Sequence, residues 1–116
     1  MRKLSDFKDE KGIQIAAEVL AIIMDILANK KNAEQAGAKT PLAMFSAFMK
    51  NSPAEMKKIF AILSEKEEME YTCDGAEAMT NMLILANDSI LVNLFISQGR
   101  TGDAKSSGSA SENTEE

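Results

Sequence analysis

The sequence predicts an all-α fold, a compact bundle of about five helices around a long apolar first helix, with a disordered C-terminal tail. Three observations predict it: apolar residues recur at helical spacing, capping residues precede most of these stretches, and no stretch alternates strictly enough for a strand. With 116 residues, 45% of them hydrophobic, the chain is sufficient for one modest core. We expect a helical domain over residues 1–98 and a disordered polar tail over residues 99–116.

The first predicted helix is the most apolar segment of the chain. It begins between Asp9 and Ile13, and residues 13–28 contain only two charged side chains, Glu18 and Asp25. At about 100° per residue, one narrow sector holds the polar positions and a neighbouring alanine: Gln14, Glu18, Asp25, Asn29 and Ala21. Large apolar side chains occupy nearly all the rest: Ile15, Val19, Leu20, Ile22, Ile23, Met24, Ile26 and Leu27. We expect a central core helix, enclosed by its own domain or with help from another chain.

Residues 30–39, KKNAEQAGAK, are polar and contain Gly37, so we expect a fraying helix end followed by a loop. The second helix begins with Thr40 as N-cap and Pro41 at the first helical position, because the hydroxyl accepts an unpaired backbone N–H and proline has none to donate. Four apolar side chains share one face of this helix: Leu42, Phe45, Phe48 and Met49.

Ser52, Pro53 and Glu55 predict a capping box for a third helix. Its expected buried face carries four apolar residues at helical spacing: Met56, Ile59, Phe60 and Leu63. The sequence EKEEMEY over residues 65–71 either continues this helix or forms a solvated acidic segment.

A fourth helix is predicted after Asp74, which with Glu77 forms a second capping pattern. Its predicted apolar stripe is Ala76, Met79, Leu83 and Ala86. Asp88 then caps a last helix through Ser97, with Gly99 as its terminator. The predicted buried face of that helix is Ile90, Leu91, Leu94 and Phe95. Residues 100–116 contain no large apolar side chain, so we expect them to be disordered.

Composition argues against most catalytic chemistry. The chain has no histidine, which removes the common zinc sites and the Ser-His and Cys-His nucleophile pairs, and its single cysteine, Cys73, cannot form an internal disulfide. The carboxylates between Glu65 and Asp74 lack the spacing and central glycine of a calcium loop. We therefore assign no catalytic, cofactor-binding or metal-binding residue and expect no enzyme; an enzyme that uses only carboxylates or lysines is the remaining catalytic alternative.

Charge and hydropathy indicate the cellular location of the chain and the kinds of partner that it does not bind. The chain has thirteen basic and eighteen acidic residues, and the basic ones stand singly or in isolated pairs such as Lys30-Lys31 and Lys57-Lys58, so they provide no electropositive stripe for nucleic acid. The longest unbroken apolar run, Val19 to Met24, is much shorter than the roughly 20 residues of a membrane span, and no apolar stretch follows the basic start as a secretory signal requires. We expect a cytosolic protein that binds neither membranes nor nucleic acid.

Eight methionines suggest where a partner binds, because flexible thioethers adapt to irregular apolar surfaces. Gap filling in an ordinary core is the alternative explanation. The stretch LAMFSAFMK offers more apolar width than one core contact needs. The candidate partner-binding residues are Leu42, Met44, Phe45, Phe48, Met49, Met56 and Phe60.

Two stretches carry a family resemblance: MRKLSDFKDEKGIQIAAEVLAIIMDIL, and EYTCDGAEAMTNMLILANDSILVNLFISQG. Together they resemble the small tail assembly chaperones of long-tailed (siphovirus-like) bacteriophages and prophages over most of residues 1–98. The matching positions are Tyr71, Asp74, Asn87-Asp88 and Leu94-Phe95. Members often have Asp-Pro before the last helix, where this chain has Asp88-Ser89.

The resemblance implies a non-catalytic, all-helical protein in the cytoplasm of the bacterial host. Such chaperones bind the tape measure protein through hydrophobic contacts, keep it soluble and help tail tube protein polymerise around it. They are commonly made in a short and a frameshifted longer form, so residues 100–116 are either the end of the short form or a lead into an extension. The alternative function is a small regulatory or adaptor protein, an obligate homodimer that buries the apolar first helix between subunits.

Overall fold

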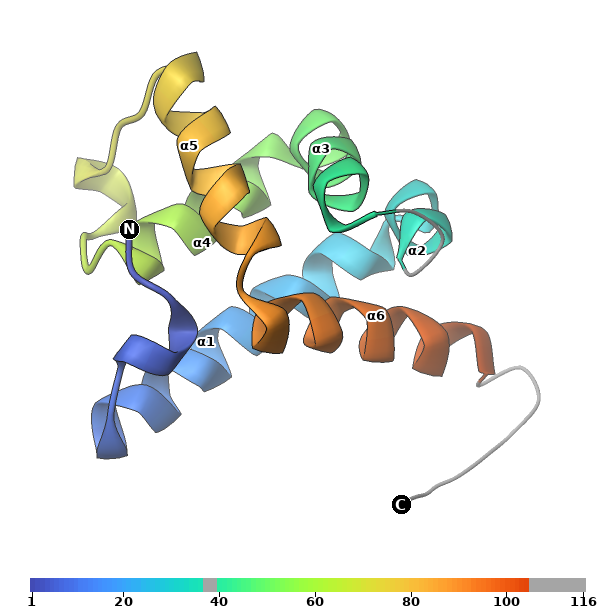
Figure 1. Ribbon diagram of the computed structural model, residues 1–116, viewed down its shortest axis with the longest axis horizontal. Helices are drawn as coiled ribbons and strands as arrows, with labels where there is room; N and C mark the ends of the chain where they lie inside the picture. Colours follow the sequence, from blue (N-terminus) through green and yellow to red (C-terminus); the bar gives the residue numbers. More distant parts are fainter. Residues whose placement is uncertain (37–39, 105–116) are drawn as a thin grey trace.

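The computed structural model describes residues 1–36 and 40–104, and every regular element among them is helical (Figure 1). This part of the chain contains six α-helices and two short 3-10 helices. The α-helices are α1 (Asp9–Ala28), α2 (Lys30–Gln35), α3 (Pro41–Asn51), α4 (Pro53–Leu63), α5 (Gly75–Ala86) and α6 (Ser89–Ala104). The 3-10 helices are η1 (Leu4–Asp6) and η2 (Glu68–Glu70). The all-α prediction is confirmed, with α2 as an additional helix.

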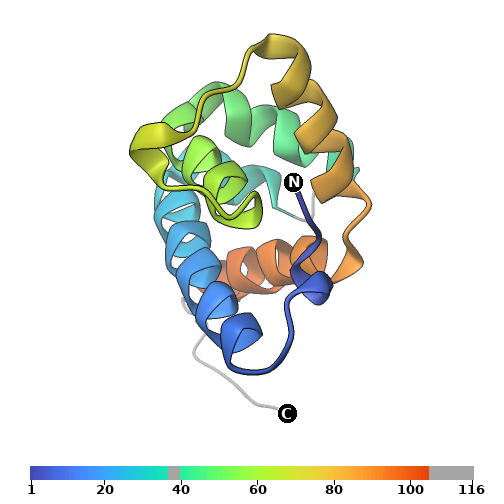
Figure 2. The same ribbon diagram turned by 90° about the vertical axis from the view of Figure 1, so that its left-hand side faces the viewer.

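Helix α1 lies along one edge of the molecule, at the left in Figure 2, with α4 and α6 against its inner side. It begins at Asp9, within the predicted interval, and five of its apolar side chains are buried: Ile15, Val19, Ile22, Ile23 and Ile26. Helices α3 and α5 pack against each other on the far side of the core from α1. Between these layers, Phe45 and Phe48 of α3 meet Phe95 of α6, with ring centroids 5.2 and 4.9 Å from that of Phe95. Such aromatic contacts join α3 to α6 across the centre of the core.

The fraying helix end and loop predicted after α1 are wrong for residues 30–35, which form a separate helix, α2. The Asn29 side chain caps this helix by accepting a 2.9 Å hydrogen bond from a backbone N–H of its first turn. Asn32 is fully buried, and its amide donates to the backbone carbonyl of Ile26 and to the Ser52 hydroxyl, both at 2.8 Å. It also accepts a 3.2 Å bond from the side-chain amide of Asn51. This network fastens α2 to the end of α1 and to the junction of α3 and α4.

Two predicted caps are confirmed. The Thr40 hydroxyl accepts a 3.2 Å bond from the backbone N–H of Ala43, and Pro41 opens α3. Asp74 and Glu77 exchange bonds of 2.8 and 3.3 Å between side chain and backbone at the start of α5. The capping box predicted at Ser52 is wrong, since its side chain makes no capping bond and accepts instead from the buried amide of α2.

After α4 the chain turns sharply at Glu65, whose φ of 58° lies in the left-handed region. The backbone N–H groups of Glu65 and Lys66 donate to the carbonyls of Ile62 and Ala61, both at 3.0 Å, the pattern of a Schellman C-cap. Residues 65–70 are all exposed, so the solvated acidic segment is the alternative that the structure shows, with η2 as a single turn within it.

The apolar stripe predicted on α5 is not the side of this helix that faces the core. Met79 and Leu83 are about half exposed, and the buried residues of α5 are Asn81, Met82 and Leu85. The Met82 side is buried because it faces α3, the helix with which α5 packs.

Helix α6 begins as predicted, because a carboxylate oxygen of the buried Asp88 accepts a 3.3 Å bond from the backbone N–H of Leu91. The other oxygen accepts a 3.0 Å bond from the backbone N–H of Leu4, which ties η1 to this corner. Leu91 and Phe95 are buried as expected, Leu94 is half-buried, and Ile90 is exposed, contrary to expectation.

The predicted end of the last helix near Ser97 and Gly99 is wrong, because α6 continues to Ala104. A Cβ atom at Gly99 would collide with the Cβ of Ala36, so this glycine allows α6 to approach the end of α2 rather than ending a helix. The predicted tail therefore loses residues 99–104 to α6, and its residues 105–116 lie outside the described part of the chain.

In the described residues no single helix is long and apolar enough to cross a membrane. Helix α5 and residues 89–99 of α6 reach the length and hydrophobicity of a membrane span only when taken together, and the two are bent by 81° relative to each other.

Candidate partner-binding surfaces

The structure places most of the predicted partner-binding residues inside the molecule. Leu42 is 43% exposed and Met49 is half-buried. The other five are buried: Met44, Phe45, Phe48, Met56 and Phe60. The wide apolar surface of α3 is used within the fold, because α2, α4 and α5 all pack on that helix and Phe95 of α6 contacts its aromatic rings. These five side chains therefore belong to the core rather than to a face open to a partner.

Other apolar side chains are open to solvent instead. Seven large ones in the described residues are between 43% and 97% exposed. They are Ile13, Met24, Leu42, Met69, Met79, Leu83 and Ile90. Only Leu42 of these seven is among the predicted partner residues, although three of the other six are methionines, the residue type that predicts partner binding in this chain. Exposed methionine and aliphatic side chains are suited to binding apolar partner surfaces.

Helix α1 exposes the whole of its predicted polar sector and, in addition, a side that the sequence predicts to be enclosed. Its polar sector lies beside α4, where Gln14 and Glu18 line a cleft between the two helices. The positions opposite the buried side chains carry Ala17 and Met24, and both are exposed. The prediction that Met24 is enclosed is therefore wrong, and the outer surface of α1 is largely apolar.

The cleft between α1 and α4 consists of two adjoining cavities of about 430 and 330 Å³. Glu18, Ile62, Lys66 and Glu68 line both, so the two form one continuous groove, named here the α1–α4 groove. Its apolar lining is Ile15, Ala21, Ile22, Ala61 and Ile62. Its charged lining is Lys11, Glu18, Lys58, Glu65, Lys66, Glu67 and Glu68. Ile15, Ile22 and Ala61 are buried beneath the groove, and Ala21 and Ile62 reach its surface. This narrow apolar strip between charged side chains suits an amphipathic helix.

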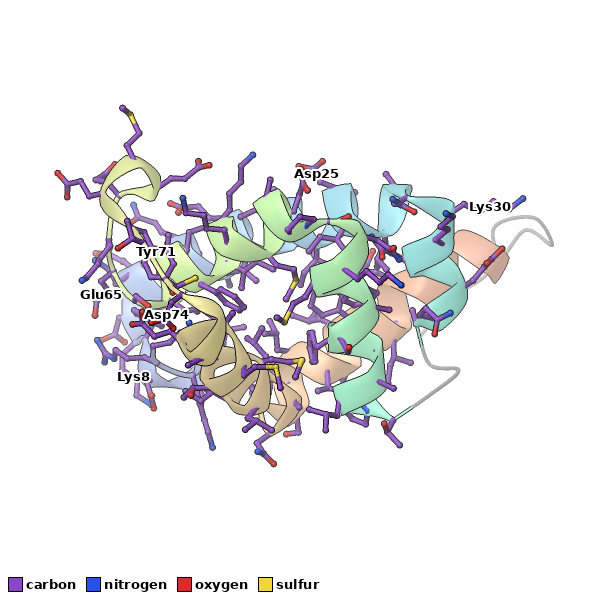
Figure 3. The ribbon with its side chains drawn as sticks, turned by 90° about the horizontal axis from the view of Figure 1, so that it is seen from above. Lys8, Asp25, Lys30, Glu65, Tyr71 and Asp74 are labelled. Carbon is purple, nitrogen blue, oxygen red and sulfur yellow. The ribbon has the colours of Figure 1, made fainter. Side chains whose placement is uncertain are left out.

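The charged and polar side chains at one end of the molecule connect segments that are distant in sequence. Arg2 and Lys11 both pair with Glu65, and the hydrogen bond from Arg2 holds the pKa of Glu65 below its usual value. Nearby in Figure 3, Tyr71 is buried and its hydroxyl accepts a 2.9 Å bond from the Asn81 amide. Burial raises the pKa of this phenol above its usual value.

Metal-binding chemistry has no evident location in the part of the chain that the structure describes, where no three His, Cys, Asp or Glu side chains are grouped to hold an ion. The described surface instead offers the α1–α4 groove and the exposed apolar side chains of α1 and α5. The resemblance to tail assembly chaperones stays a prediction from the sequence. Comparison with protein-family models, with curated proteins and with solved structures finds no match for this chain.

Proposed function

We propose that this chain is a non-catalytic phage tail assembly chaperone that binds the tape measure protein and assists assembly of the tail tube in the bacterial cytoplasm. The sequence resemblance suggests this role. The observation that carries it is the exposure of seven large apolar side chains on a small helical protein with a net charge of −5. Exposed apolar surface supports binding of another macromolecule, and the net charge favours solubility while the surface is unoccupied.

The α1–α4 groove is the proposed site for a helix of the tape measure protein. Along α1 the groove extends from Lys11 to Ile22, a distance of about 17 Å at about 1.5 Å per residue, which matches about three turns of a bound helix. The client's apolar stripe would cover Ile62 and the adjacent isoleucines, and its charged flanks would meet the rims. Exposed Met79 and Leu83 of α5 offer a second contact area for a long client.

Coexpression with a helical fragment of the tape measure protein tests this role. The wild-type chain should increase the soluble fraction of the fragment. Glu18→Trp should abolish the increase, because Glu18 lines both cavities and an indole at this exposed position fills the groove. The matched control is Asp25→Trp, an exposed acidic position on the same helix that lines neither cavity and should retain the effect. Equal loss in both variants would contradict the groove, and no increase with the wild-type chain would contradict the chaperone role.

The second candidate is a regulatory or adaptor homodimer with no client. The outward apolar side chains of α1, Ile13 and Met24, favour it. A chain that is a stable dimer in solution, and that leaves the tape measure fragment insoluble, would support this alternative.

A further inference from the structure

The outward face of α1 has the spacing of a coiled-coil seam. Ile13 is 71% exposed and Met24 57% exposed, Ala17 and Ala28 are exposed, and Leu20 is half-buried. Steps of four, three, four and four residues separate these positions, so they lie on one side of a helix over about four turns. From Ile13 to Met24 the steps alternate between four and three, the pattern by which two helices pack along a common seam, and Ala28 continues the same side of the helix one turn further. We name these five residues the α1 seam.

The α1 seam carries no charge. Between residues 12 and 28 the only charged side chains are Glu18 and Asp25, and Glu18 lies on the side of α1 that lines the groove with α4. The residues that flank the seam are also uncharged: Gln14, Ala16 and Ala21. A helix face that meets only water normally carries charged side chains, so this face has the composition of a contact surface.

We infer that the α1 seam binds a second copy of this chain, with the two α1 helices antiparallel about a two-fold axis between residues 20 and 21. In this register residue n lies opposite residue 41 − n of the second copy. Ile13 then faces Ala28, Met24 faces Ala17, and Leu20 lies beside the axis next to its own counterpart. Each large side chain meets a small one, which allows close packing, and the same patch is used on both chains as a two-fold interface requires.

Charges at the two ends of α1 also favour the antiparallel arrangement. Glu10, exposed, lies seven residues before Ala17 and so on the same side of the helix. Lys30 and Lys31, also exposed, follow directly after α1, and Figure 3 shows Lys30 at the opposite end of the molecule from Lys8. The antiparallel register brings Glu10 to the two lysines of the second copy, twice per dimer. Lys11 does not oppose this, because it lies on the other side of α1, 3.7 Å from Glu65.

A parallel pair is less favourable in each respect. It would place Glu10 against Glu10 and Met24 against Met24, so that like charges meet and the size matching is lost. The helix dipoles would also point the same way, whereas an antiparallel pair aligns opposite ends.

Sedimentation velocity on the full chain over a range of concentrations tests the dimer. A single helix pair is a small interface, so we expect a reversible dimer whose apparent mass rises to twice that of one chain at high concentration. Met24→Glu should remain a folded monomer at every concentration. The matched control is Met79→Glu, which changes a residue of similar exposure on α5, 54% against 57%, and should dimerise like the wild type. A wild-type chain that stays monomeric throughout, or a Met24→Glu variant that still dimerises, would overturn the inference.

Cysteine cross-linking in a Cys73→Ser background tests the direction. Leu20→Cys should form a disulfide with its own counterpart near the axis. Ile13→Cys alone should not, because the two copies of residue 13 would lie about 22 Å apart along the helices, far beyond disulfide range. Mixing Ile13→Cys with Ala28→Cys chains should give the heterodimeric disulfide. Efficient self-linkage of Ile13→Cys would show a parallel pair and overturn the proposed register.

Charge reversal provides an independent measurement. Glu10→Lys should weaken association by about three- to tenfold, the effect of two partly exposed ion pairs. Adding Lys30→Glu and Lys31→Glu to the same chain should restore it. Unchanged association in Glu10→Lys would contradict the predicted end contacts. None of the five α1 seam residues lines the α1–α4 groove, so loss of dimerisation in Met24→Glu and loss of client binding in Glu18→Trp are distinguishable.

Discussion

Replacement of Asn32 by alanine should remove a large part of the stability of the fold. The fully buried side chain donates to the Ile26 carbonyl and the Ser52 hydroxyl at 2.8 Å and accepts from Asn51 at 3.2 Å. Each bond contributes about 1 kcal/mol, and the buried Ser52 hydroxyl left without its donor costs about 1 kcal/mol more. The expected loss is about 3 to 4 kcal/mol, a large fraction of the roughly 5 to 15 kcal/mol that stabilises a typical domain.

Urea denaturation followed by far-ultraviolet circular dichroism measures this loss. Ser52→Ala removes only one of the three bonds and should cost about 1 kcal/mol. The double variant should be less destabilised than the sum of the single variants by about 1 kcal/mol, since the two residues share a bond. A loss below 1 kcal/mol for Asn32→Ala, or strict additivity of the two changes, would refute the view that this amide holds α1, α2 and the α3–α4 junction together.

Three further predictions concern single positions. Ile23→Asp should unfold the chain, because the side chain is fully buried and an unpaired carboxylate there costs several kcal/mol, whereas Ala21→Glu at an exposed position should be tolerated; equal melting temperatures would contradict the placement of the buried face. Glu65→Gly should be more stable than Glu65→Ala by about 1 kcal/mol in urea, because both lose the ion pairs and only alanine keeps the cost of the left-handed backbone; equal stabilities would argue against that conformation. Since burial raises the pKa of Tyr71, the contribution of this residue to stability should be constant below the ordinary phenol pKa of about 10 and fall as the pH rises above it, because the phenol ionises first in the unfolded chain. Tyr71→Phe should abolish this alkaline loss while costing about 1 to 3 kcal/mol at neutral pH, because Asn81 loses its acceptor; an unchanged pH profile would contradict the assignment.

Local signals allowed the helix starts to be predicted well. Thr40 and Asp74 cap helices as expected, because a cap depends on a side chain and the backbone within three residues of it. Asp88 was likewise identified as a cap, but its second bond, to Leu4, was not predictable, because the two residues are 84 positions apart.

The choice of buried face depended on long-range packing and was predicted less well. Helix α5 is apolar on two sides, and only contact with α3 decides that Met82 is buried while Met79 is exposed. Gly99 has the sequence character of a helix terminator, yet its function in the fold is close approach to Ala36. The same limit explains why five of the seven predicted partner-binding residues are buried. The apolar width of α3 does not reveal that neighbouring helices cover it on several sides.

The bond between Leu4 and Asp88 has a consequence for synthesis of the protein. At a translation rate of about 5 to 20 residues per second, the 84 positions between them correspond to a delay of about 4 to 17 s. During this interval α6 has not yet left the ribosome, and the isoleucines of α1 lack one of the helices that cover them. The nascent polypeptide therefore passes through a period in which apolar side chains of its first helix are exposed to solvent and the backbone N–H of Leu4 lacks its acceptor, Asp88.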